Sequence, residues 1–487
     1  MEAVWNEAKR QAWISSLTEV MPLAPLDHTA PQNYVMKCWG FSFPGQILHS
    51  KDGGAPRCVY KTVKACNDTP VRLDIPWSEV FVSQVLDSSE FLWTFQELSA
   101  QGVPASSMIK DTLWLIPDPI MRPSHPSYGT VFYPVTLKAT FIPGGLILGF
   151  AFYHGIMDGT GTVEFAKLFN DANRKGDISN NEAVTFHKMT ERFNRFAAET
   201  AKSTPVNPRS MHGYDFTIPP SQPVIPEAIA KIFSISSSRI TALHSEAPTH
   251  VRATHGSGAF ITPTAVLSAL FWLHITRARL HARRILPSGT TRFANAVSIR
   301  NRLPAELGFT DQPYMGNMWL RALASSTVGD LVGADLSRPA TTAQLAAAAW
   351  LICQSVRALS DPATMRQHIA IATRATDPAD ETLTWPEVDA AIRRSIARHC
   401  TGVDATVGVE LGADVEFDIP GVQGGKGKAA WVRRAYVAFV GAMMVLPKVG
   451  GAKGEADWEV YIALRGEDME VLERDGELGG WLARPAA

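Results

Sequence analysis

Apolar and polar positions along the chain predict alternating strands and helices in both halves of the sequence. The clearest strand candidate is Gly145–Tyr153, a nearly unbroken run of aliphatic and aromatic residues that is typical of a buried strand. Residues Val131–Ala139 predict its neighbour, and Pro143 and Gly144 form the expected turn between the two. Pro134 favours an edge or a bulge for the neighbour, because proline donates no ladder hydrogen bond.

The same periodicity sets out the remaining elements. It predicts a helix and the segment leading into it over residues 79–101. It predicts further helices over residues 163–174, 189–202, 238–246, 261–280, 341–359 and 467–475. It predicts further strands over residues 231–236, 295–299, 435–445 and 457–463. Thr262 is the expected N-cap of the helix over 261–280, with Pro263 at its first position. The alternation indicates an α/β (α+β) chain with two layers per domain and leaves the topology open.

A proline-rich segment, residues 203–227, separates the two halves. Six prolines occur in it, at positions 205, 208, 219, 220, 223 and 226. That density stops helices and central strands, so the segment is expected to be extended. A chain of 487 residues favours two domains. We therefore expect an N-terminal domain over 1–202, a crossover linker over 203–227 and a C-terminal domain over 228–487. The alternative is a long surface loop within one domain.

Composition narrows the class of protein. The chain is 46% hydrophobic and 19% charged, which indicates a globular protein. Its net charge of −1 gives no excess of positive charge that would attract nucleic acid. The N-terminus is mixed in charge, unlike a secretory signal, and no apolar stretch is long enough to insert in a membrane. We expect a cytoplasmic monomer with no bound metal and no tightly bound cofactor. The cysteines are odd in number and scattered, which favours a reducing compartment; they are Cys38, Cys58, Cys66, Cys353 and Cys400.

The strongest candidate for chemistry is His154, where the predicted buried strand ends. Gly155, Gly159 and Gly161 follow it, Asp158 lies four positions on, and helical spacing begins at residue 163. His154 thus lies at the mouth of a strand-to-helix turn, and a free imidazole titrates near neutrality, which suits a general base. Taken alone, however, a histidine after an apolar strand is more often structural.

Ordered blocks along the chain resemble the BAHD superfamily of CoA-dependent acyltransferases. His154, Asp158 and Gly159 resemble its H-x-x-x-D-G motif, and Ala24–His28 with Tyr34 resembles its fungal N-terminal opening. Further matching residues are Thr262, Val266, Ser268, Ala269, Trp272, Arg277–Arg279, Arg300–Leu303, Tyr314, Gly316, Asn317, Gly441–Pro447, Trp458–Val460, Asp468 and Met469. Within the family the likeness is strongest to fungal acetyltransferases of secondary metabolism, the trichothecene 3-O-acetyltransferase group, which implies a role in mycotoxin biosynthesis.

The resemblance implies both a fold and a reaction. The fold would consist of two domains like those of chloramphenicol acetyltransferase, with a central solvent channel that holds His154. Acyl-CoA, in this group acetyl-CoA, would enter from one side and a small hydroxylated metabolite from the other. His154 would take the hydroxyl proton, and the acyl group would pass directly to the acceptor.

Asp158 has two interpretations. It could orient His154, as the acid of a serine-protease triad orients its histidine. In the family, however, this aspartate pairs with an arginine of the second half, and Arg300 is the matching position. The resemblance therefore favours a bidentate pair between Asp158 and Arg300, with the carboxylate turned away from His154.

One block departs from the family pattern. Where the family has D-F-G-W-G before a Gly/Lys stretch, residues Asp418–Lys428 read D-I-P-G-V-Q-G-G-K-G-K. The family motif lies outside the active centre, so the departure concerns the loop near CoA rather than the base. Lys426 and Lys428 are candidate contacts to CoA phosphates, with a solvated loop as the alternative, and Arg433 and Arg434 carry the same two interpretations.

Two other functions compete with acyl transfer from CoA. A condensation-type enzyme of peptide synthesis is built on a related fold, but such enzymes normally carry two consecutive histidines, and Tyr153 occupies the first place here. A non-catalytic or weakened ligand-binding homologue is the third possibility, and the altered region at Asp418 is the one feature that supports it.

Overall fold

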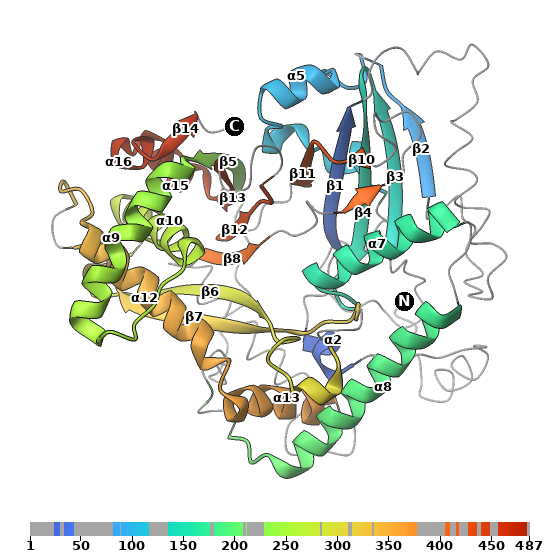
Figure 1. The fold of residues 1–487 in the computed structure, drawn as a ribbon. Helices are drawn as coiled ribbons and strands as arrows, with labels where there is room; N and C mark the ends of the chain where they lie inside the picture. The colour runs from blue at the N-terminus through green and yellow to red at the C-terminus, as the bar shows by residue number, and fades with distance from the viewer. Residues whose placement is uncertain are drawn as a thin grey trace, which may run out of the picture.

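Two mixed β-sheets organise the chain in the computed structural model. It describes residues 24–29, 34–42, 81–87, 89–115, 135–175, 180–207, 211, 228–282, 285–309, 314–333, 336–376, 405–409, 415–417, 427–435, 440–448 and 456–484. The first sheet has the strand order β11-β1-β4-β3-β2 and the second has β14-β5-β13-β12-β8-β6-β7. Figure 1 shows the first sheet with α7 across one face and the second sheet among the C-terminal helices.

The strand bounds are as follows. The first sheet contains β1 (Tyr34–Ser42), β2 (Phe81–Val85), β3 (Val135–Ile142), β4 (Gly145–Tyr153) and β11 (Trp431–Arg434). The second contains β5 (Ile229–Ile235), β6 (Thr290–Ser298), β7 (Trp319–Thr327), β8 (Ala405–Val409), β12 (Ala442–Val445), β13 (Trp458–Leu464) and β14 (Leu482–Arg484). A separate ribbon is formed by β9 (Glu416–Phe417) and β10 (Gly427–Lys428).

The α-helices cover and connect the sheets. They are α2 (Pro25–Thr29), α5 (Phe95–Ala100), α6 (Lys110–Leu113), α7 (Gly159–Lys175), α8 (Asn180–Ser203), α9 (Ser237–His255), α10 (Pro263–His281), α11 (Val328–Val332), α12 (Thr342–Ala358), α13 (Pro362–Thr376), α15 (Gly466–Arg474) and α16 (Gly476–Gly479). Short 3-10 turns lie at η1 (Ala105–Ser107) and η3 (Ala305–Leu307). The predicted cap of α10 is confirmed, since the Thr262 hydroxyl accepts a hydrogen bond from Ala265 N at 3.1 Å.

The central strand of the first sheet matches its prediction. All residues of β4 are buried, and the strand pairs antiparallel with β1 and β3 along its length. The chain is apolar there because both faces of β4 are covered, by the side chains around Tyr153 on one face and around Phe152 on the other. The neighbour β3 begins at Val135, and residues 131–134 of the predicted strand lie outside the described residues.

The helix predicted over residues 79–101 is wrong for most of its length. Phe81–Val85 forms β2, which pairs parallel with β3, and the helix α5 covers only Phe95–Ala100. Pairing with a neighbouring strand overrides local helical spacing here. The short helix has its own start signal, a capping box in which Thr94 and Glu97 satisfy each other's backbone N–H groups.

The helix predicted over 238–246 extends further than expected. Helix α9 continues through Pro248 to His255. Proline removes one intrahelical hydrogen bond, but Ala247 and Val251 on either side of it are buried in the core of the second sheet. Tertiary burial therefore carries the helix past a residue that ends most isolated helices.

Elements from the two halves of the chain pair and pack with one another. Strand β11 comes from the C-terminal half but pairs with β1 in the first sheet, where Val432 lies opposite Trp39. One core cluster joins Phe193 of α8 to Ile369 of α13 and Ile299 beyond β6. The domain boundaries at 1–202, 203–227 and 228–487 remain a prediction, because residues 208–210 and 212–227 lie outside the described residues.

Candidate active site

His154 lies on the turn that leaves β4 and enters α7, between the two sheets. The residue is partly exposed, and its ring packs beside the indole of Trp319, the first residue of β7, with the ring centroids 6.1 Å apart. The predicted strand-to-helix turn is therefore present. It brings the imidazole of the first sheet against an aromatic residue of the second.

Asp158 and Arg300 form the ion pair that the resemblance implies. Arg300 Nη1 donates to Asp158 Oδ2 at 2.8 Å and Nη2 donates to Oδ1 at 2.9 Å, across 142 residues of sequence. The backbone N–H of Gly161 donates to Oδ1 at 2.9 Å, and that of Met318 donates to Oδ2 at 2.8 Å. None of the four hydrogen bonds comes from His154, so the geometry favours the structural pair over the dyad.

The pair locks the turn from both sides. Arg300 follows β6, and its Nη2 also donates to the carbonyl oxygens of Gly316 at 2.7 Å and Tyr314 at 3.2 Å. Arg300 and Asp158 are buried. On the other side, Gly161 packs so closely on the backbone of Met315 that a Cβ would overlap the carbonyl of Met315, whereas a Cβ at Gly159 would meet nothing. Gly161 is thus the glycine whose missing side chain this contact requires.

A second set of contacts holds the backbone of His154. Asn317 Nδ2 donates to the carbonyl oxygen of His154 at 2.8 Å and to Asp27 Oδ1 at 2.9 Å, while Asn317 N donates to the same Oδ1 at 2.8 Å. The other carboxylate oxygen of Asp27 accepts from Ala24 N at 2.8 Å. In the sequence, Asp27 and Asn317 stand out only as parts of blocks that resemble the family, and no role was predicted for either residue.

The surroundings of His154 favour its neutral form. Burial lowers the pKa of His154 below its ordinary 6.5, and the charge of Arg434 also lowers it, while its own backbone carbonyl, the charge of Asp158 and the Asn317 side chain raise it. Its Nδ1 is buried, and among the described residues no atom lies at a distance and angle that make a hydrogen bond to it. A neutral imidazole has one ring nitrogen without a proton, which is the form that a general base requires.

Asp27 is a buried carboxyl group whose titration should be visible in stability. Burial raises its pKa to about 7, against hydrogen bonds from Asn317 and Ala24 that lower it. Between the unfolded and the folded pKa the folded protein binds more protons, so the free energy of unfolding falls as pH rises toward 7.

We expect Asp27→Asn to remove this pH dependence. The contribution amounts to at most about 4 kcal/mol for a shift of about three pKa units. Urea unfolding of wild type and Asp27→Asn at pH 5 and pH 8 measures it. If the free energy of unfolding falls by the same amount between pH 5 and pH 8 in both proteins, the pH dependence does not come from Asp27.

The structure describes some of the other candidate residues. Asp418 and Lys426 lie outside the described residues. Lys428 is exposed on β10, opposite Glu416 of β9. Arg433 is buried, and its Nη2 lies 2.9 Å from Glu459 Oε2 of β13, so it is not available to a CoA phosphate.

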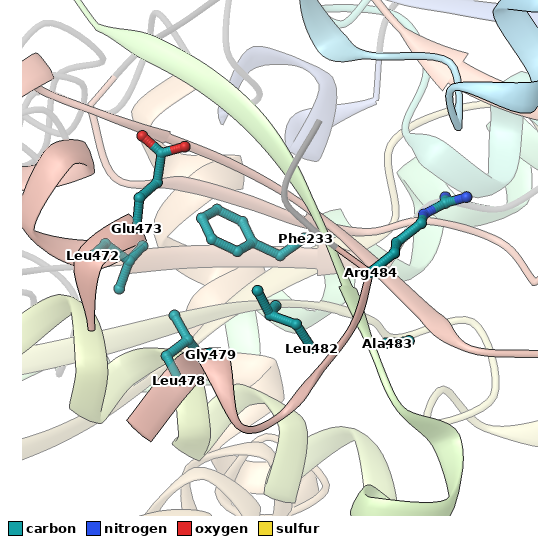
Figure 2. Close-up of a pocket in the computed structure, with 8 residues that line it drawn as sticks. All are labelled: Phe233, Leu472, Glu473, Leu478, Gly479, Leu482, Ala483 and Arg484. Carbon is teal, nitrogen blue, oxygen red and sulfur yellow. The ribbon is translucent and has the colours of Figure 1, made fainter. Parts of the chain in front are cut away.

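A cavity of about 530 Å³ lies away from this site, beside β5 and the C-terminal helices. Its apolar lining includes Phe233, Leu472, Leu478 and Leu482, and Figure 2 shows Phe233 between Glu473 on one side and Arg484 on the other. Both charges are paired, Glu473 with Lys231 and Arg484 with Glu459. None of the lining residues belongs to the elements around His154, so the cavity is separate from the candidate active site.

Neither a metal site nor a membrane span is found in the part of the chain that the structure describes. No group of three or more histidine, cysteine, aspartate or glutamate side chains there could hold a metal ion. No helix there is long and apolar enough to cross a membrane.

Comparison with known proteins agrees with this geometry. The chain is 25% identical over 410 residues to the trichothecene 8-O-acetyltransferase of Fusarium sporotrichioides, covering 79% of this chain and 78% of that protein. It is 27% identical over 346 residues to the trichothecene 3-O-acetyltransferase TRI101 of the same fungus, covering 70% and 66%. The crystal structure of F. graminearum TRI101 with coenzyme A and deoxynivalenol matches the fold with a TM-score of 0.67 at 20% identity, covering 94% of this chain and 98% of that one. The family model described as "Transferase family" matches residues 125–479, so the chain belongs to this family of BAHD-type acyltransferases.

Proposed function

We propose that this protein transfers an acyl group, acetyl in the first instance, from acyl-CoA to a hydroxyl group of a small secondary metabolite. The observation that carries the proposal is the imidazole of His154, whose pKa burial lowers and whose turn is held by the buried pair of Asp158 and Arg300. Family membership supports the transferase reaction. The relatives' names support the acceptor class: trichothecene and eremophilane O-acetyltransferases.

The chemistry follows from the protonation state of His154. Its neutral ring takes the proton of the acceptor hydroxyl as the oxygen attacks the thioester carbonyl carbon. The tetrahedral intermediate then collapses with cleavage of the C–S bond, and the imidazolium returns the proton to the CoA thiolate. General-base assistance of this kind contributes about 10²- to 10⁴-fold. No covalent intermediate on the protein is needed, because both substrates reach one base.

Release of CoA thiol from acetyl-CoA tests this proposal. The assay uses a panel of alcohols that includes a trichothecene and an eremophilane alcohol. Acceptor-dependent thiol release with formation of the acetate ester supports O-acyl transfer. A thermal shift with an acceptor but no thiol release supports the ligand-binding homologue, and transfer only from a carrier-protein thioester supports a condensation-type enzyme.

The pH dependence of kcat/KM should report His154. The base works in its neutral form, so kcat/KM rises as pH rises through the pKa of His154. Because burial lowers that pKa, the limb lies below pH 6.5 and activity is level at neutral pH. Initial rates between pH 5 and 8 check this. A limb centred above pH 7 would contradict the geometry.

A further inference from the structure

Three segments that are far apart in sequence meet at the carbonyl of His154. Asp27 comes from α2, Asn317 from the segment before β7, and His154 from the turn after β4. The Asn317 and Asp27 side chains are buried, and the proposed proton transfer uses neither of them directly. Their contacts nevertheless surround the base.

Asp27 fixes which way the Asn317 amide faces. Asn317 Nδ2 carries two hydrogens, and both are used, one toward His154 O and one toward Asp27 Oδ1. If the amide were reversed, its oxygen would face two acceptors and both hydrogen bonds would be lost. The carboxylate of Asp27 therefore selects a single orientation of Asn317.

Two polar atoms beside this contact are complementary. Asn317 Oδ1 and His154 Nδ1 are both buried, and neither has a hydrogen-bond partner of full geometry among the described residues. One is an acceptor, and the other is a donor when it carries a proton. The Asn317 side chain also favours the protonated ring, since it raises the pKa of His154. Both atoms belong to residues that are already joined by the hydrogen bond from Asn317 Nδ2 to the carbonyl oxygen of His154.

We propose that Asn317, oriented by Asp27, is a positioning residue that holds the His154 backbone and keeps the ring proton on Nδ1, so that Nε2 is free to act as the base. The inference rests on the proposed function for its catalytic consequence. A histidine whose proton lies on the wrong nitrogen cannot accept one at the reacting face. The tautomer itself is a property of the folded protein and can be measured without a substrate.

The experiment compares four variants with wild type: Asn317→Ala, Asp27→Ala, Asp27→Asn and Thr291→Val. Asp27→Asn keeps an oxygen to accept from Asn317, whereas Asp27→Ala removes it. Thr291→Val is the matched control, because it removes a buried hydroxyl that accepts from Trp272 Nε1 at 2.8 Å in the core of the second sheet. Histidine ring ¹⁵N spectra across pH 4.5–8 give tautomer and pKa, and the His154 signal is the one missing in His154→Gln. Thermal unfolding and steady-state kinetics are measured alongside.

In wild type we expect Nδ1 to be protonated and Nε2 unprotonated in the neutral ring. Asn317→Ala and Asp27→Ala should mix the two tautomers and lower the pKa of His154. They should also reduce kcat by about 10- to 100-fold, as a small misplacement of a catalytic group does, and change KM for acetyl-CoA by less than about threefold. Asp27→Asn should stay within about threefold of wild type in kcat. Thr291→Val should lower the melting temperature and leave the tautomer and pKa unchanged.

Other results would overturn the proposal. A wild-type ring protonated on Nε2, or an Asn317→Ala ring with unchanged tautomer and pKa, excludes positioning by Asn317. So does a loss of kcat in Thr291→Val as large as in Asn317→Ala. If wild type transfers no acyl group, the proposed function fails, but the ¹⁵N spectra still decide whether Asn317 sets the state of His154.

Discussion

His154→Ala is expected to lower kcat for acyl transfer by at least about 100-fold, since it removes the proposed general base. Stability should change little, because His154 is partly exposed and the Asp158–Arg300 pair that holds its turn does not involve the ring. Thiol release from acetyl-CoA with the preferred acceptor measures the first effect, and thermal unfolding measures the second.

A matched histidine variant gives the control. His250 is exposed on α9, and its backbone carbonyl accepts a hydrogen bond from the Thr254 hydroxyl at 3.2 Å, a contact that alanine keeps. His250→Ala should keep wild-type turnover. If His154→Ala retains more than about a tenth of wild-type kcat while folded, its loss is smaller than a general base contributes, and His154 is not the base.

Local sequence signals predicted those elements whose stability is largely local or whose burial is complete. The apolar run of β4 and the cap of α10 at Thr262 both appear where the pattern placed them. The strand β2 did not, because five residues with mixed periodicity acquire their structure from pairing with β3. No local signal shows that β11, from the C-terminal half, completes a sheet of the N-terminal half.

The candidate site was predictable to different depths. The pattern of apolar residues alone predicted a histidine at the end of a strand. The pairing of Asp158 with Arg300 followed only from the resemblance to a family. The contacts of Asn317 with Asp27 and His154 were not predictable, since they join residues up to 290 positions apart. Lys37 was missed as well: it lies fully buried in an apolar strand and donates to Thr162 Oγ1 at 3.0 Å on the first turn of α7. A lysine within a buried strand was the available signal.

Asp158→Asn should reduce both stability and turnover. Each carboxylate oxygen accepts one hydrogen bond from Arg300 and one from a backbone N–H, of Gly161 at Oδ1 and of Met318 at Oδ2. An asparagine amide nitrogen would therefore face two donors in either orientation. The variant also leaves the Arg300 charge buried without a counterion, which costs about 3–5 kcal/mol. Because the turn that presents His154 loses its anchor, kcat should fall together with the free energy of unfolding.

Arg300→Ala tests the same pair by removing the other partner. The double variant shows whether the two single changes lose the same stabilising interaction. If Asp158 and Arg300 act as a unit, Asp158→Asn with Arg300→Ala should cost less than the sum of the single changes, with a coupling energy of about 1–3 kcal/mol. Glu164→Gln, on the helix that begins directly after Asp158, is the control: its 3.2 Å pair with Lys167 is partly exposed and should contribute less than about 1 kcal/mol. Urea unfolding of the five proteins gives the energies, and thiol release gives the turnover. Single-variant losses that simply add would show that the two residues act independently, and a normally stable Asp158→Asn with an altered pKa at His154 would restore the dyad interpretation.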